Sequence, residues 1–168
     1  RRRMTVVDAV FPLSLDRQAI ECLLPHRGPI FACQHLIAHG PRSYTATARW
    51  SLDNAIIQGH FPGEPIVPGV MLIEAVTQLA GAGLLSADAY AQSLTGNRIG
   101  VLASVRRCNF KRPVLPGQDV VFDINCRQVG EAAVQITARA CVDGAEVAQL
   151  ETLMVYVDRA CLNAQIPC

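Results

Sequence analysis

The pattern of hydrophobic and polar positions divides the chain into alternating segments and one long apolar segment. Alternation in period two is typical of strands with one buried face, because successive side chains point to opposite faces of a sheet. The pattern predicts strands over residues 30–38, 44–50, 99–110, 120–127, 133–142 and 146–157. Turn residues at 130–131 and 143–144 join the last three of these strands as hairpins.

Two segments have the pattern of helices. A short helix is expected from Asp16 to Leu23, ending before Pro25 because the residue before a proline avoids helical angles. A long helix is expected from Val70 to about Ser86, and it is apolar on nearly all sides, which predicts burial. Residues 51–69 contain several prolines and glycines and are expected to form a rigid, irregular segment.

Two strands, one long helix and a four-stranded antiparallel meander predict an α+β fold. One antiparallel sheet would curl around the central helix and bury it. The 168 residues have the length of one ordinary domain, and no linker divides them, so we expect a single domain over residues 1–168. Residues 1–15 would be an N-terminal extension and residues 159–168 a tail. A dimer would let two such sheets join.

Charge and composition narrow the function classes. The 15 basic and 14 acidic side chains give a net charge of +1, which provides no general attraction to nucleic acid or to anionic membranes. No run reaches the roughly 18 apolar residues needed to span a bilayer, and the start of the chain lacks a secretory signal. The 7 cysteines have irregular spacings, which favours reduced thiols. We therefore expect a cytoplasmic protein with no membrane or nucleic-acid partner.

A polar stripe interrupts the long helix. Glu74, Thr77, Gln78 and Gly81 follow the spacing i, i+3, i+4, i+7 and share one face. A buried carboxylate costs free energy unless it is paired or protonated, so an arginine partner or an exposed edge would also explain Glu74. His60, however, lies on the proline-stiffened segment that leads into this helix. A histidine on a rigid loop and a carboxyl group on a buried helix favour a preorganised acid–base pair.

The segment that carries both residues has a specific resemblance. Residues 58–78, QGHFPGEPIVPGVMLIEAVTQ, resemble the signature of the FabZ-type 3-hydroxyacyl-acyl carrier protein dehydratases, which belong to the hotdog-fold FabA/FabZ family. Residues 24–27 (LPHR), 110–114 and 116–119 are also similar to family segments. The resemblance spans residues 16–158 and implies the hotdog fold. Glu74 stands where FabA-type enzymes carry Asp, which favours the FabZ-type branch.

The resemblance implies an activity and an assembly. A (3R)-3-hydroxyacyl thioester on an acyl carrier protein would lose water to give the trans-2-enoyl thioester. His60 would remove the α-proton and Glu74 would protonate the leaving hydroxyl group. No metal or organic cofactor is required. In the family each site combines the histidine of one protomer with the carboxyl group of its partner, so a homodimer or a trimer of dimers is expected.

Further residues are expected to bind the thioester substrate or the acyl carrier protein. Backbone N–H groups at Gly69 and Val70, at the start of the long helix, are expected to bind the thioester oxygen. Phe61 and Gln78 would contact the substrate. A basic cluster would meet the carrier protein, although a solvated strand face explains any single member equally well. Its members are Arg106, Arg107, Lys111 and Arg112.

The other histidines are given no catalytic role. His35 and His39 follow the pattern H-x-x-x-H, but on a predicted strand and turn with no evident third ligand, so no metal site is expected. His26 is assigned a structural role.

Some residues differ from the family pattern, and these differences leave other functions open. Gly100-Val101-Leu102 stands where a bulky aromatic often gates the acyl tunnel, and Gln34-His35 replaces a usual Asp-Arg pair. A specialised role in polyketide or polyene assembly would fit these differences. The alternatives are another hotdog enzyme, such as an acyl thioesterase or an enoyl-coenzyme A hydratase, and a non-catalytic partner subunit of a heteromeric dehydratase.

Overall fold

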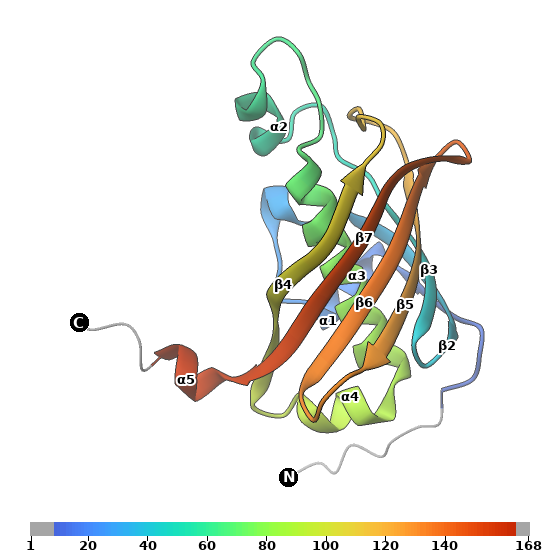
Figure 1. The fold of residues 1–168 in the computed structure, drawn as a ribbon, viewed down its shortest axis with the longest axis vertical. Coiled ribbons are helices and arrows are strands. Elements are labelled where there is room, and N and C mark those ends of the chain that lie inside the picture. Colours follow the sequence, from blue (N-terminus) through green and yellow to red (C-terminus); the bar gives the residue numbers. More distant parts are fainter. Residues whose placement is uncertain (1–8, 164–168) are drawn as a thin grey trace.

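A single antiparallel sheet curled around one long helix forms the body of the molecule (Figure 1). The computed structural model describes residues 9–163. The strands are β1 (Leu13–Asp16), β2 (Cys33–Gly40), β3 (Ser43–Ala48), β4 (Arg98–Phe110), β5 (Val120–Gln128), β6 (Ala133–Val142) and β7 (Ala145–Asp158). The helices are α1 (Arg17–Leu23), the 3-10 helix η1 (Gly28–Ile30), α2 (Ala55–His60), α3 (Gly69–Ala87), α4 (Ala89–Leu94) and α5 (Arg159–Asn163). The predicted α+β fold is confirmed.

The strand order corrects part of the predicted topology. The seven strands follow the order β1-β2-β3-β5-β6-β7-β4, with antiparallel neighbours throughout. β5, β6 and β7 form the predicted hairpins, but β4 pairs with β7 and β3 is the neighbour of β5. The predicted meander of four consecutive strands is therefore wrong in its first strand. Alternation identifies a strand but does not specify its neighbour, and the connection over residues 111–119 lets the chain cross to another strand.

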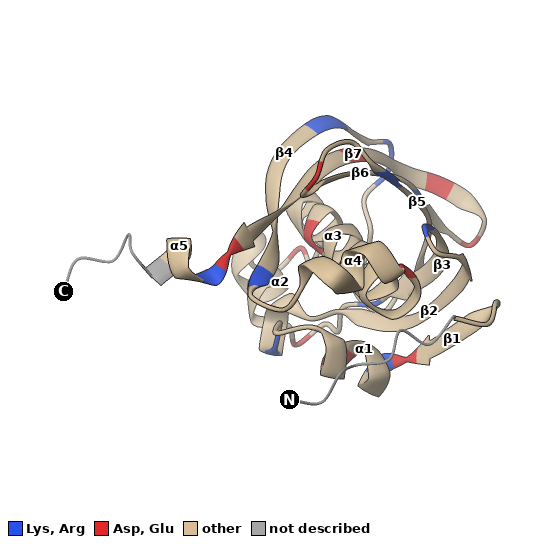
Figure 2. Cartoon of the chain, turned by 90° about the horizontal axis from the view of Figure 1, so that it is seen from below, with Lys and Arg blue, Asp and Glu red and all other residues tan. Residues whose placement is uncertain are grey.

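α3 is the centre of the core. It begins one residue before the predicted start and ends one residue after the predicted end, and most of its residues are buried. Seen from below, the sheet curves around α3 and α4 while α1 lies on the open side (Figure 2). By length and composition alone α3 could cross a membrane, but 61% of its most apolar window is buried inside the protein. Its apolar surface therefore packs against the sheet, as predicted.

Several short elements escaped the sequence analysis. β1 lies partly inside the expected N-terminal extension and pairs with β2. The segment 51–69 is not irregular throughout, because Asn54 caps α2 by accepting a hydrogen bond from the backbone N–H of Ile56. Asp88 caps α4 in the same way. β2 begins at Cys33 instead of Ile30, since Gly28 and Pro29 start a 3-10 turn.

β4 forms one edge of the sheet, and no strand within residues 9–163 lies on its outer side. Apolar side chains are exposed along it: Leu102 is 41% exposed, Val105 is 43% exposed and Phe110 is 48% exposed. A long, apolar edge strand is a template for pairing with another chain, and natural proteins rarely leave one uncovered. This edge is therefore a surface suited to association.

Candidate active site

Glu74 faces a cavity of about 590 Å³ between α3, β4 and the segment that follows α1. Thr77, Gln78 and Gly81 line the same cavity, which confirms that the predicted stripe shares one face. The side chain of Glu74 is 29% exposed, so its carboxyl group meets the cavity instead of being sealed in the core. The apolar residues of the lining include Leu23, Leu24, Leu85, Ile99, Val101 and Met154.

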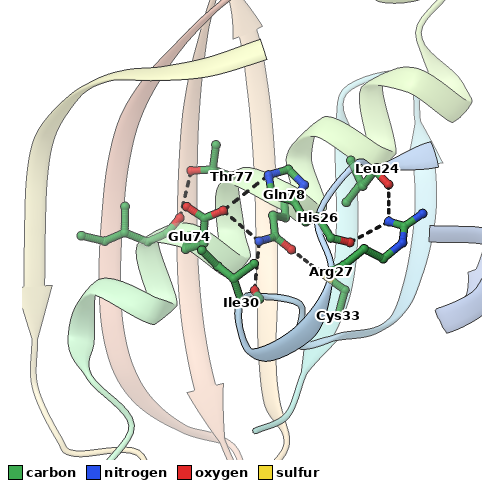
Figure 3. Close-up of polar contacts among 9 residues, drawn as sticks. Leu24, His26, Arg27, Ile30, Cys33, Glu74, Thr77 and Gln78 are labelled. Atoms are coloured by element: carbon green, nitrogen blue, oxygen red, sulfur yellow. Dashed lines mark hydrogen bonds and ion pairs between the residues drawn. The ribbon is translucent and has the colours of Figure 1, made fainter. Parts of the chain in front are cut away.

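Gln78 fixes one oxygen of the Glu74 carboxyl group (Figure 3). Its Nε2 donates to Oε1 of Glu74 at 2.8 Å and to the carbonyl oxygen of Ile30 at 3.0 Å. Its Oε1 accepts from Sγ of Cys33 at 3.6 Å, and burial raises the pKa of that thiol to about 12, which keeps its proton in place. The amide is only 2% exposed and has partners on both sides, so it holds Glu74 in one orientation.

His26 also approaches Glu74, which the sequence analysis did not anticipate. Its Nε2 lies 3.6 Å from Oε1 of Glu74, and it lines the same cavity. The neighbouring Arg27 turns back on the chain and donates from Nη1 to the carbonyl oxygens of Leu24 and His26, each at 2.6 Å. The resemblance of the LPHR segment to the family was the available signal, but a purely structural role was assigned to its histidine.

His60 is the last residue of α2 instead of part of an irregular loop. Ile57 anchors this helix in the core, and Asn54 ties its start to η1 by donating to the carbonyl oxygen of Pro29 at 2.8 Å. The His60 imidazole is exposed and packs against the ring of Phe61, with 4.1 Å between the ring centroids. Phe61 is itself 51% exposed, so the end of α2 presents an imidazole and an aromatic ring to the surroundings.

One chain does not bring His60 and Glu74 into the same cavity. His60 lines a separate hollow of about 270 Å³ with Gly69, Phe110 and other residues, whereas the cavity at Glu74 does not include it. α2 lies beyond the end of the sheet at which α3 begins (Figure 1). Within one chain the two side chains therefore open into different hollows.

The start of α3 contains the two residues, Gly69 and Val70, at which the sequence analysis expects the thioester oxygen to bind. The N–H groups of Gly69 and Val70 lie in the first turn, where a helix leaves its donors without intrahelical partners. A Cβ atom at position 69 would lie 2.7 Å from the ring of Phe110, so a larger residue here would have to displace that ring. Val70 is 66% exposed, which keeps this helix end accessible in the single chain.

The four basic residues do not form one patch. Lys111 and Arg112 line the hollow of His60, and Lys111 is paired with Glu146, which lowers the pKa of that carboxyl group. Arg107 instead borders a hollow on the sheet that also includes Asp123, Arg139 and Glu151, and Arg106 lies beside it on β4. Figure 2 likewise shows basic and acidic stretches interspersed around the molecule.

Two basic residues outside the expected cluster line the cavity of Glu74. Arg98 begins β4 and Arg159 follows β7, and both border the cavity together with Gln92 and Thr95. Gly100, which stands at the position of the missing aromatic gate, also lines it, and a Cβ atom there would lie 2.8 Å from Sδ of Met154. Met154 therefore occupies the space beside this part of the wall.

The histidines of the H-x-x-x-H pattern make different contacts. His35 pairs with the hydroxyl group of Ser14 and His39 with that of Thr45. Among residues 9–163, no three His, Cys, Asp or Glu side chains are grouped so that they could hold a metal ion. The six cysteines that the structure describes are free, and Cys168 lies outside the described residues.

Comparison with known proteins agrees with the fold and the motif. Residues 40–151 match the FabA-like domain family. The chain is 31% identical to the 3-hydroxyacyl-[acyl-carrier-protein] dehydratase FabZ of Halorhodospira halophila over 81% of this chain and 88% of that protein. It is 30% identical to the FabZ of Anaeromyxobacter sp. over 86% of this chain and 92% of that protein.

Two solved structures share the fold. One is the dehydratase heterocomplex ApeI:P from Xenorhabdus doucetiae, with a TM-score of 0.69, 15% identity, and coverage of 92% of this chain and 99% of that chain. The other is a hot-dog-like protein from Thermanaerovibrio acidaminovorans, with a TM-score of 0.59, 20% identity, and coverage of 75% and 90%. Because of the family match over residues 40–151 and the 31% identity to a FabZ dehydratase, the chain belongs to the FabA-like family, and within it to the FabZ-type hotdog dehydratases.

Proposed function

We propose that the protein removes water from a (3R)-3-hydroxyacyl thioester carried by an acyl carrier protein and forms the trans-2-enoyl thioester. The observation that carries this proposal is the Glu74 carboxyl group, which is held on the buried helix α3 and faces a largely apolar cavity of about 590 Å³. A cavity of this size suits an acyl chain, and membership of the FabZ-type family supplies the class of reaction.

The active unit is a dimer in this proposal. His60 and Glu74 line different cavities of one chain, and β4 presents an apolar edge that no other strand of residues 9–163 pairs with. A homodimer joined along β4 would cover that edge and bring α2 of each protomer to the cavity of the other. Each of the two sites would then combine His60 from one protomer with Glu74 from its partner.

The chemistry divides between the two side chains. A neutral His60 accepts the α-proton of the thioester, while the N–H groups of Gly69 and Val70 stabilise the negative charge that develops on the thioester oxygen. Glu74 gives its proton to the 3-hydroxyl group, which leaves as water when its C–O bond breaks and the C–C double bond forms. Transfer of the proton from His60 back to Glu74 restores both groups for the next turnover.

The surrounding residues receive roles that follow from their positions. Gln78 orients the acid, and Phe61 supports the His60 imidazole and contacts the substrate. Lys111 and Arg112 lie beside His60 and are the first candidates for docking the carrier protein, and Arg106 and Arg107 on β4 are the second. The free cysteines fit a reducing compartment, so we place this activity in the cytoplasm.

A dehydration assay tests the proposal. Purified protein is incubated with a 3-hydroxyacyl carrier-protein thioester while the loss of one water from the carrier-bound chain is followed by mass spectrometry. We expect turnover, and a loss of about a hundredfold or more for His60→Ala and for Glu74→Gln. Release of the free carrier thiol would point to a thioesterase instead, and no turnover of any thioester would favour a non-catalytic partner subunit.

A mixing experiment tests the shared site. His60→Ala and Glu74→Gln homodimers are each expected to be inactive, because every site lacks one group. A mixed dimer would regain one intact site and contain one doubly altered site, so random exchange of subunits restores about a quarter of the native activity. If mixing under conditions of demonstrated subunit exchange restores nothing, the two groups do not come from different protomers.

A further inference from the structure

We propose that His26 is a positioning residue that, together with Gln78, holds Oε1 of Glu74 as a hydrogen-bond acceptor and leaves Oε2 to carry the proton used in dehydration. This inference rests on the proposed function. His26 comes from the segment between α1 and η1, far from Glu74 in the sequence, and it lines the same cavity. Its imidazole points toward the Glu74 carboxyl group (Figure 3).

Two side-chain nitrogen atoms lie near the same oxygen of Glu74. Nε2 of Gln78 donates to Oε1 of Glu74 at 2.8 Å, and Nε2 of His26 lies 3.6 Å from the same atom. The second distance is beyond a normal hydrogen bond, but a movement of a few tenths of an ångström would close it. Catalytic hydrogen bonds are often long without substrate and tighten when it binds. Within residues 9–163, Oε2 makes no hydrogen bond and is the oxygen left for the substrate.

The surroundings of the imidazole decide which nitrogen carries its proton. Nδ1 of His26 is buried and has no hydrogen-bond partner among the described residues. A buried N–H group without an acceptor costs about 1–3 kcal/mol. In the neutral ring the proton is therefore favoured on Nε2, where it points at Glu74. His26 then donates from Nε2 toward Oε1, in the same sense as the Gln78 amide.

The backbone around His26 is fixed independently of Glu74. Pro25 restricts the preceding residue, and Arg27 binds the carbonyl oxygens of Leu24 and His26. Leu24 is buried in the core. The imidazole therefore extends from a turn whose backbone is held by the Arg27 side chain. A rigid backbone of this kind is expected for a group that orients a reacting side chain.

The consequence is a specific placement of the proton on the acid. If Oε1 carried the proton, its hydrogen would face Nε2–H of His26 and the amide N–H of Gln78, and these hydrogens would repel one another. The proton of the neutral acid is therefore directed to Oε2, on the cavity side. Losing His26 would leave Glu74 present but free to place its proton on either oxygen, which slows the chemical step more than it weakens substrate binding.

Matched variants test this role. His26→Leu removes the donor, His26→Gln keeps a neutral N–H donor, and His39→Leu removes a histidine outside the cavity as a control. We expect kcat to fall about tenfold to a hundredfold in His26→Leu with KM within about threefold, while His26→Gln keeps most of the activity. His39→Leu should match the native protein. Equal losses in His26→Leu and His26→Gln, or a change in KM alone, would overturn the proposal.

A double variant asks whether His26 acts through Glu74. If it does, adding His26→Leu to Glu74→Gln causes little further loss, because the group that His26 orients has already been disabled. Independent, multiplicative losses would show that His26 acts in another way, such as supporting the fold. Thermal unfolding of each variant separates loss of structure from loss of orientation.

A spectroscopic measurement tests the inference even if the protein fails to dehydrate any thioester. Protein labelled with nitrogen-15 in histidine reports the tautomer of His26 by NMR. We expect the Nε2-protonated form in the native protein and a shift of its ring signals in Glu74→Gln. A proton on Nδ1, or ring signals indifferent to Glu74→Gln, would overturn the contact, whereas absence of turnover alone would count only against the proposed function.

Discussion

Replacement of Gly83 by alanine should destabilise the protein, although alanine is the better helix former. Gly83 lies on the buried side of α3, and a Cβ atom there would be 2.5 Å from Cε2 and 2.6 Å from Cζ of Tyr44. Tyr44 is only 2% exposed on β3, and its hydroxyl group donates to the carbonyl oxygen of Pro41, so its ring has little room to retreat. The substitution therefore forces the helix and the sheet apart.

The magnitude follows from two opposing effects. Glycine to alanine inside a helix stabilises by about 1 kcal/mol, whereas overpacking a well-filled core costs about 1–3 kcal/mol. A carbon–carbon approach this far inside the normal contact of about 3.5–4.0 Å places the cost near the upper end. We expect a net loss of about 2 kcal/mol in the free energy of unfolding and a fall in Tm of about 4–8 °C.

Gly81→Ala provides the matched control on the same helix. Its Cβ atom would meet only Cδ2 of Leu24 at 3.8 Å, an ordinary contact, so the helix propensity gain of about 0.5–1 kcal/mol should remain. Urea unfolding of both variants at one fixed protein concentration gives the comparison, because the stability of the proposed dimer would depend on concentration. The reasoning fails if Gly83→Ala is as stable as Gly81→Ala.

Three further predictions concern the proposed dimer, a helix cap and the thiols. Val105→Asp places a charge on the exposed edge of β4 and should weaken the dimer about tenfold or more, as read by light scattering across a dilution series; an unchanged dimer would place the interface elsewhere. Asp88→Ala removes the cap of α4 and the partner of Arg42, and should lower the free energy of unfolding by about 2–4 kcal/mol in urea. Since burial raises the pKa of the Cys33 thiol to about 12, Cys33 should resist alkylation at about pH 8 while the exposed Cys22 reacts, and equal labelling of the native protein would contradict this.

The sequence predicted the elements of this fold better than their arrangement. The alternation in β5, β6 and β7 and the apolar run of α3 depend on local periodicity, and both were recovered nearly to the residue. The pairing of β4 with β7 was not, because it joins segments separated by two other strands. Periodicity reports which face of a strand is buried and says nothing about which strand lies beside it.

Short elements were missed for a related reason. α2 and α4 have 6 residues each, too few for a helical period to stand out from a segment rich in turn-forming residues. They exist because Asn54 and Asp88 satisfy the first N–H groups and because Ile57 and Ala91 are buried. The capping residues were visible in the sequence, but a cap indicates a helix only where tertiary packing supports it.

Within the candidate site, too, the sequence predicted the residues that share one helix but not the contact that depends on the fold. Glu74 stood out because a carboxyl group on an apolar helix is costly, and the helical spacing placed Thr77, Gln78 and Gly81 beside it. No periodic pattern links these residues to His26, whose approach to Glu74 depends on how the chain turns after α1. Motif resemblance identified the LPHR segment, but a contact across the fold was needed to suggest what its histidine does.

The two reacting groups of the proposed site are held in place very differently, and catalysis should therefore depend on formation of the dimer. Gln78 and the neighbouring His26 support Glu74 from within its own chain, whereas His60 lies exposed at the end of a short helix. Separating the protomers would therefore remove the base and leave the acid and its cavity intact. A monomeric variant should still bind an unreactive acyl thioester while its kcat collapses. Loss of binding together with turnover would show instead that the partner also builds the walls of the cavity.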